Sequence, residues 1–74
     1  MLRVTVYHGS TVWFQGQAAE AVLPAEDGEL SVWSFHAPML CALAAGMVTV
    51  DDRRLAVQGG VARMARNTLT VVSH

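Results

Sequence analysis

The amino-acid sequence predicts an all-β fold, a small β-sandwich of two antiparallel sheets made of short strands. At the amino terminus apolar side chains alternate with polar ones, which is the two-residue period of a half-buried strand. Further runs rich in branched and aromatic side chains are short and follow one another closely. Turn signals separate these runs, at Gly9-Ser10, Asp51-Asp52, Gly59-Gly60 and Asn67. Short strands with such frequent turns favour a sandwich or barrel over alternating strands and helices.

The first third of the chain predicts three strands. Residues 2–7 form the first, with Leu2, Val4 and Val6 on one face. Residues 11–14 and 18–23 form the next two, because both runs are rich in residues that suit a pleated surface. Gly16 lies between them and marks a bulge or bend.

The middle of the chain predicts a polar loop over residues 24–28, followed by a strand. In that strand Leu30 and Val32 face one side, and the residues that alternate with them face the other. Residues 37–45 are ambiguous: Ala, Leu and Met favour a helix, but Pro38 and the length of nine residues weaken that interpretation. The last part of the chain predicts four strands, at residues 47–50, 54–57, 61–65 and 68–72.

Length and composition describe one small globular domain over residues 1–74. A chain of 74 residues buries about 60% of its unfolded surface, so a single core is the most that it can build. The hydrophobic fraction of 53% excludes the disordered class. No apolar run approaches the roughly 20 residues of a membrane-spanning helix. We expect no secretory leader, because a strand pattern begins within two residues of Met1.

Charge and cysteine content exclude further classes. Five Arg and six acids give a formal charge of -1, with no basic stripe for a nucleic acid. Cys41 is the only cysteine, so an intramolecular disulfide is impossible and a reducing compartment is expected. His8, His36 and His74 are too scattered to predict a metal site, and no cofactor is expected.

A set of motifs in a fixed order carries a family resemblance. The central ones are Leu23-Pro24, Gly28-Glu29-Leu30, His36-Ala37-Pro38-Met39-Leu40, and Leu43 with Gly46 before alternating valines. The flanks add Val12-Trp13-Phe14-Gln15-Gly16, Val57-Gln58-Gly59-Gly60-Val61 and Asn67-Thr68-Leu69-Thr70-Val71. With these motifs the chain resembles the amino-terminal domain of the F-type ATP synthase epsilon subunit family. The chain departs from the pattern at Ser31, where the family usually has Gly, and at Ser34-Phe35, where it usually has Pro-Gly.

The resemblance implies a β-sandwich in which residues 39–43 are extended, and it implies a noncatalytic rotor function. Such a domain couples the gamma subunit to the c-ring at the cytoplasmic face of a bacterial plasma membrane, without inserting into the membrane. The family normally continues into a two-helix carboxy-terminal domain beyond the 74 residues seen here. A naturally short form and one domain of a longer protein both stay open. Without those helices we expect no epsilon-type inhibition of ATP hydrolysis.

The resemblance also implies two contact sites. The Gly-Glu-Leu loop would meet the polar loops of the c-ring, through Gly28, Glu29 and Leu30. The turn before the next strand would meet the gamma subunit, through His36, Ala37, Pro38, Met39 and Cys41. Each residue also has a purely structural interpretation: a solvated turn for the acids, a ring that fixes the turn before Pro38 for His36, and a small buried apolar residue for Cys41.

Two other functional classes stay open. A free-standing sandwich that binds a small ligand would need a concave pocket with converging polar groups. A catalytic thiol would need His36, Cys41 and a carboxylate within hydrogen-bond reach, although no surrounding motif supports one. Gly59-Gly60 lacks the Lys and Ser or Thr of a phosphate-binding loop, and we expect it to be a turn.

Overall fold

Seven strands and no helix make up the structure, a computed structural model that describes all 74 residues. The strands are β1 (Leu2–His8), β2 (Thr11–Ala18), β3 (Glu20–Ala25), β4 (Gly28–Trp33), β5 (Met39–Val50), β6 (Arg53–Ala65) and β7 (Thr68–Ser73). They are hydrogen-bonded in the order β2-β1-β7-β6-β5-β3-β4. The all-β prediction is confirmed.

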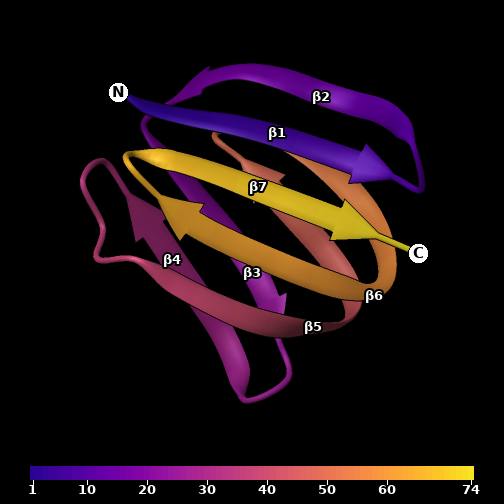
Figure 1. The fold of residues 1–74 in the computed structure, drawn as a ribbon. Helices are drawn as coiled ribbons and strands as arrows, with labels where there is room; N and C mark the ends of the chain where they lie inside the picture. The colour runs from indigo at the N-terminus through magenta and orange to yellow at the C-terminus, as the bar shows by residue number, and fades with distance from the viewer.

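The two layers of the sandwich are joined through β5 and β6, which are 12 and 13 residues long. Both strands curve, so that each belongs to one layer at its first half and to the other at its second (Figure 1). The second half of β6 pairs with β7, and the second half of β5 pairs with β3. The first layer therefore contains β2, β1 and β7, and the second contains β3 and β4.

The prediction of two antiparallel sheets needs one refinement. The seven strands form a single hydrogen-bonded sheet folded over on itself, and β1 and β7 are parallel. A sheet can fold in this way only where its long strands bend sharply. The sequence pattern reports alternation within a strand and not the partner of that strand, so it could not show this pairing.

The prediction of a turn at Gly59-Gly60 is wrong, because both glycines lie inside β6 at its bend. Gly60 has φ +138 and faces the neighbouring strand so closely that a Cβ there would lie 2.0 Å from the Val72 carbonyl oxygen. Glycine is needed for the φ and for the close approach. The strands expected at residues 54–57 and 61–65 are thus one strand, and so are those at 39–43 and 47–50.

The prediction of a bulge at Gly16 is also wrong. Gly16 pairs in regular register with Val4, and β2 runs through it to Ala18. The register instead shifts between Val6 and Tyr7, whose partners Phe14 and Val12 leave Trp13 as the extra residue. The break before β3 falls at Ala19, the residue between Ala18 and Glu20.

The core lies between the two layers and is built by the inward face of every strand. Leu2, Val4 and Val6 of β1 are fully buried, as the alternation predicts. Val32 is buried and the half-buried Leu30 packs against the core, whereas Glu29 and Trp33 are exposed. Each fully buried Val or Leu stabilises the fold by roughly 1.5–3 kcal/mol relative to an exposed one. The core therefore fixes which face of each strand is left for partners.

Candidate functional site

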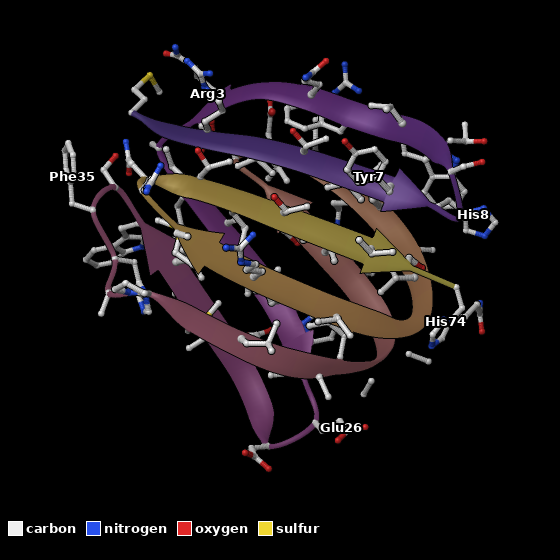
Figure 2. All side chains as sticks on the ribbon, in the orientation of Figure 1. Arg3, Tyr7, His8, Glu26, Phe35 and His74 are labelled. Carbon is white, nitrogen blue, oxygen red and sulfur yellow. The ribbon has the colours of Figure 1, made fainter.

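The β3–β4 hairpin presents the acids of the predicted c-ring loop. Ala25 pairs with Gly28, so Glu26 and Asp27 form the turn at the tip, where Figure 2 shows Glu26 pointing into solvent. Gly28 has φ +124, a conformation that favours glycine. Glu29 is exposed beside them. Of the three predicted contact residues, Leu30 differs, because its side chain is half-buried against the core.

The turn from β4 to β5 holds the predicted gamma-subunit residues. The His36 N–H donates to the Trp33 carbonyl oxygen at 3.1 Å. The His36 Nδ1 lies 2.7 Å from the Ala37 carbonyl oxygen, so the ring fixes the turn before Pro38 when Nδ1 carries the proton. Phe35 adopts φ +61, which suits the glycine that the resemblance places there.

Asn67 ties this turn to the rest of the first layer. Its Oδ1 accepts a hydrogen bond from the Phe35 N–H at 2.7 Å, and its Nδ2 donates to the Met1 carbonyl oxygen at 2.8 Å. Its backbone oxygen accepts from the Arg3 N–H at 3.1 Å. One side chain in the β6–β7 turn therefore positions the β4–β5 turn against the start of β1. Sequence reasoning treated Asn67 only as a turn residue, and nothing local indicates these distant partners.

Met39 and Cys41 lie on the inward side of β5 and pack partly against the core. Burial raises the pKa of the Cys41 thiol, and the hydrogen bond with the Ala62 backbone opposes this shift without cancelling it. A thiol held protonated is a poor nucleophile. Leu40 lies between them on the outward side and is 72% exposed. Leu40 is therefore better placed than Met39 or Cys41 to contact a partner.

An apolar row crosses the outer face of the first layer, and it consists of Val12, Tyr7, Val72, Val61 and Ala42. Consecutive members are register partners on neighbouring strands from β2 to β5. Because directly paired residues point to the same side of a sheet, the five side chains form a continuous band. Val12, Val61 and Val72 are between 45% and 48% exposed. Tyr7 marks the band on β1 in Figure 2.

The parallel row beside it adds Leu40 and Arg63, which are register partners on β5 and β6. At the carboxyl end of β1, next to Tyr7, the His8 ring stacks on the Trp13 ring, with centroids 4.3 Å apart. Trp13 is the extra residue of β2 at the register shift described above. The apolar row could not be found from the sequence, since it depends on the register of five strands.

Asp51 is a second residue that sequence reasoning treated only as part of a turn. Its carboxylate accepts hydrogen bonds from the Ala19 N–H at 3.0 Å and from the Glu20 N–H at 3.1 Å. Its own N–H donates to the Glu20 carbonyl oxygen at 3.0 Å. Asp51 thus clamps the break between β2 and β3. Glu20 in turn accepts a hydrogen bond from the Trp33 Nε1 at 2.6 Å.

The structure offers no pocket and no group of three or more His, Cys, Asp or Glu side chains that could hold a metal. Membrane-spanning helices are likewise absent. His36 bonds to its own turn, and no hydrogen bond joins it to Cys41. What the molecule does present is a broad apolar row on one face and an acidic hairpin tip.

Comparison with known proteins gives a single result. The family model for the β-sandwich domain of the ATP synthase delta/epsilon chain matches residues 1–74. The chain is 38% identical over 66 residues to ATP synthase epsilon chain 2 of Burkholderia orbicola, covering 81% of this chain and 43% of that protein. It is 39% identical over 66 residues to the epsilon chain of a Synechococcus strain, covering 84% and 47%. The chain thus spans about half the length of these curated relatives.

Solved structures match in fold. A chain of the Euglena gracilis mitochondrial ATP synthase, from a structure of OSCP, F1 and the c-ring, superposes with a TM-score of 0.87 at 18% identity. The match covers 97% of this chain and 49% of that one. A chain of the Tetrahymena thermophila central stalk and c-ring structure gives 0.76 at 17% identity, covering 97% and 62%. At these identities the likeness establishes the sandwich fold.

Proposed function

Because the chain belongs to the ATP synthase delta/epsilon chain β-sandwich family, we propose that it is the sandwich domain of an epsilon subunit. In this function it is a noncatalytic part of the rotor of an F-type ATP synthase. It fastens the gamma subunit to the c-ring and turns with them. The work is mechanical: cation flow turns the ring, and the sandwich passes torque without making or breaking bonds.

The observation on which the proposal rests is the apolar row on the first layer. Its five members come from five strands, β2, β1, β7, β6 and β5. Only a rigid sheet keeps such residues in one band. Exposed apolar bands of this kind are typical of protein interfaces. The row and Leu40 lie on the same face, and the β4–β5 turn with His36, Ala37 and Pro38 leads directly into that face. We propose that this face binds the gamma subunit.

The β3–β4 hairpin supplies the second contact. Glu26, Asp27 and Glu29 gather at its tip. The tip adjoins the Ala42 end of the apolar row, because the Glu26 N–H donates to the Ala42 carbonyl oxygen at 3.1 Å. The resemblance implies that this tip rests on the polar loops of the c-ring, and acids at the rim of an interface orient a basic partner more than they add affinity. We therefore assign Gly28 and Glu29 to the ring contact, with Leu30 anchoring the hairpin to the core.

This assignment places the domain at the membrane surface, as a peripheral part of the complex. Two of the relatives described above come from bacteria, and we propose the cytoplasmic face of a bacterial plasma membrane as its location. A packed interior deforms little under load, which suits a part that transmits force between two partners.

The binding of a matching gamma subunit tests the proposal. We expect Val61→Asp, which puts a charge in the middle of the apolar row, to raise the Kd for gamma by at least tenfold. Ala56→Asp is the matched control, because Ala56 is also exposed on β6 but lies in the half that belongs to the other layer. Thermal melting of both variants shows that the fold is intact. Equal affinity of the two variants, or no gamma binding by the unaltered chain, would contradict the proposal.

The alternative, a free-standing sandwich that binds a small ligand, predicts a concave pocket. The structure has none, and no observation favours this function over the rotor proposal.

A further inference from the structure

Phe35 combines two features that are unfavourable in an isolated domain. Its side chain is 82% exposed, more than any other large apolar residue of the chain. Its backbone has φ +61, in the left-handed region that a bulky residue rarely adopts. A small polar residue or glycine would avoid both costs. The chain nevertheless places an aromatic ring here, and Figure 2 shows that ring pointing away from the body of the molecule.

The position of Phe35 is fixed and not left to a loose loop. The Asn67 Oδ1 accepts the Phe35 N–H at 2.7 Å, and Asn67 is itself held by its Nδ2 bond to the Met1 carbonyl oxygen. The next residue, His36, is bonded to the Trp33 carbonyl oxygen through its N–H. Hydrogen bonds therefore hold the backbone on both sides of the exposed ring. A large aromatic side chain on an ordered backbone loses little entropy on binding, which is typical of interface anchors.

We propose that Phe35 is an aromatic anchor that inserts into an apolar pocket of the gamma subunit, and that Asn67 is the residue that positions it. The inference rests on the proposed function, and it names a contact residue outside residues 36–39 and 41, which the resemblance implies. The gamma subunit is the partner because Phe35 directly precedes the His36-Ala37-Pro38 turn. It also lies at the opposite end of β4 from the acidic hairpin tip, as Figure 2 shows for Phe35 and Glu26.

The decisive variant is Phe35→Gly, measured for gamma binding and for thermal stability. Glycine accepts φ +61, so we expect the melting temperature to stay the same or rise, while the Kd for gamma rises at least tenfold. A merely structural role would lower stability instead. Trp33→Ala is the matched control, because Trp33 is also an exposed aromatic, at 62%, but lies on the other layer and bonds to Glu20. Its Kd should stay within twofold of the unaltered chain.

Two variants, Asn67→Asp and Asn67→Gly, test the positioning role. Asp and Gly both tolerate the φ of +59 that Asn67 adopts. Asn67→Asp keeps an oxygen that can accept the Phe35 N–H, whereas Asn67→Gly removes it. We expect Asn67→Gly to accelerate amide exchange at Phe35 and to raise the Kd at least fivefold, and Asn67→Asp to restore most of the affinity. In the double variant with Phe35→Gly, the loss of Asn67 should add nothing further.

The outcomes separate the anchor from the function. If Val61→Asp weakens binding but Phe35→Gly stays within twofold of the unaltered chain, the anchor is wrong and the gamma interface stands. Equal losses of affinity for gamma in Phe35→Gly and Trp33→Ala would also overturn the anchor, since they would show only nonspecific hydrophobic binding. Faster exchange at Phe35 in Asn67→Gly with unchanged affinity would overturn the positioning role. No binding by the unaltered chain would overturn the proposed function itself.

Discussion

At the scale of single residues, two polar side chains in turns hold together segments that are far apart in the sequence. Asp51 bonds to the backbone of residues 19 and 20, and Asn67 bonds to Met1 and Phe35. Asp51 and Asn67 both have positive φ, which Asp and Asn tolerate better than other side chains. Asp51 and Asn67 therefore each have two roles: they allow the backbone conformation of the turn, and their side chains bond to a distant segment.

Replacing Asp51 should destabilise the fold through the loss of these contacts. We expect Asp51→Ala to cost about 1–3 kcal/mol of unfolding free energy, because two backbone N–H groups lose a charged acceptor. Asp51→Asn keeps one acceptor oxygen and should cost less. Urea denaturation measures both, with Asp52→Ala as the control, since the neighbouring Asp52 is exposed in the same turn. A cost for Asp52→Ala as large as that for Asp51→Ala would contradict the clamp.

The raised pKa of Cys41 predicts a loss of stability at alkaline pH. Burial keeps the thiol protonated in the folded chain at pH values where the unfolded chain has released its proton. This contribution is fully present below the unfolded pKa of about 9, and it is lost as the pH rises through the folded pKa. We expect the urea midpoint of the unaltered chain to fall more steeply in this range than that of Cys41→Ala. Parallel curves for the two chains would contradict the shift.

At the scale of elements, the curvature of β5 and β6 creates the sandwich. Each strand serves both layers, so the bend in β6 at Gly59 and Gly60 determines how the first layer closes over the second. On β5, an added Cβ at Gly46 would lie 2.9 Å from the Pro24 Cβ of the neighbouring β3. Glycine at these positions is therefore a requirement of packing between elements.

Gly60→Ala should be among the most damaging single substitutions in the chain. Its Cβ would overlap the Val72 carbonyl oxygen at 2.0 Å in addition to the strain of φ +138, so we expect a cost of about 3 kcal/mol or more. Gly28→Ala is the matched control, because it has φ +124 with nothing within 4 Å, and only the φ strain of about 1–2 kcal/mol should remain. Thermal or urea unfolding compares the two. Equal costs would mean that the close approach at Gly60 does not matter.

At the scale of the whole molecule, the two proposed partner surfaces lie on different elements and adjoin where the Glu26 N–H donates to the Ala42 carbonyl oxygen. The apolar row crosses the outer face of the first layer, whereas the acidic tip is the end of the β3–β4 hairpin in the second layer (Figure 1). A rigid domain with two separate contact surfaces can bind two partners at once and transmit force between them. This arrangement predicts that the two contacts can be impaired independently.

Glu29→Arg tests this independence in an assembled ATP synthase. Reversing an exposed charge at the hairpin tip should weaken coupling to the ring while the fold and the Kd for gamma stay unchanged, because Glu29 lies outside the apolar row. ATP-driven ion pumping in membrane vesicles measures the coupling, and Ser31→Arg, one exposed position further along β4, is the control. Normal pumping by Glu29→Arg would count against the ring assignment.

Much of the fold could be predicted from local patterns. The inward residues of β1 and β4, the turns at Asp51 and Asn67, and the starts of β6 and β7 agree with the structure to within a residue or two. The errors fall at glycines: Gly59-Gly60 suggested a turn and Gly16 a bulge, because a glycine signals freedom of the backbone and not how that freedom is used. For the candidate site, the hairpin tip and the His36 residue lie in turns, as the sequence predicts, whereas neither the apolar row nor the exposure of Phe35 could be predicted from it.

Alternation, turn chemistry and family motifs are local properties, so the amino-acid sequence by itself determined the all-β class and the family. Tertiary structure alone decided which strands pair, and with them the parallel β1–β7 contact and the fold of one sheet into two layers. The apolar row exists only through that pairing, because its five members are brought together by register and not by sequence. Register depends on contacts between distant segments, and a pattern within one strand carries no record of them.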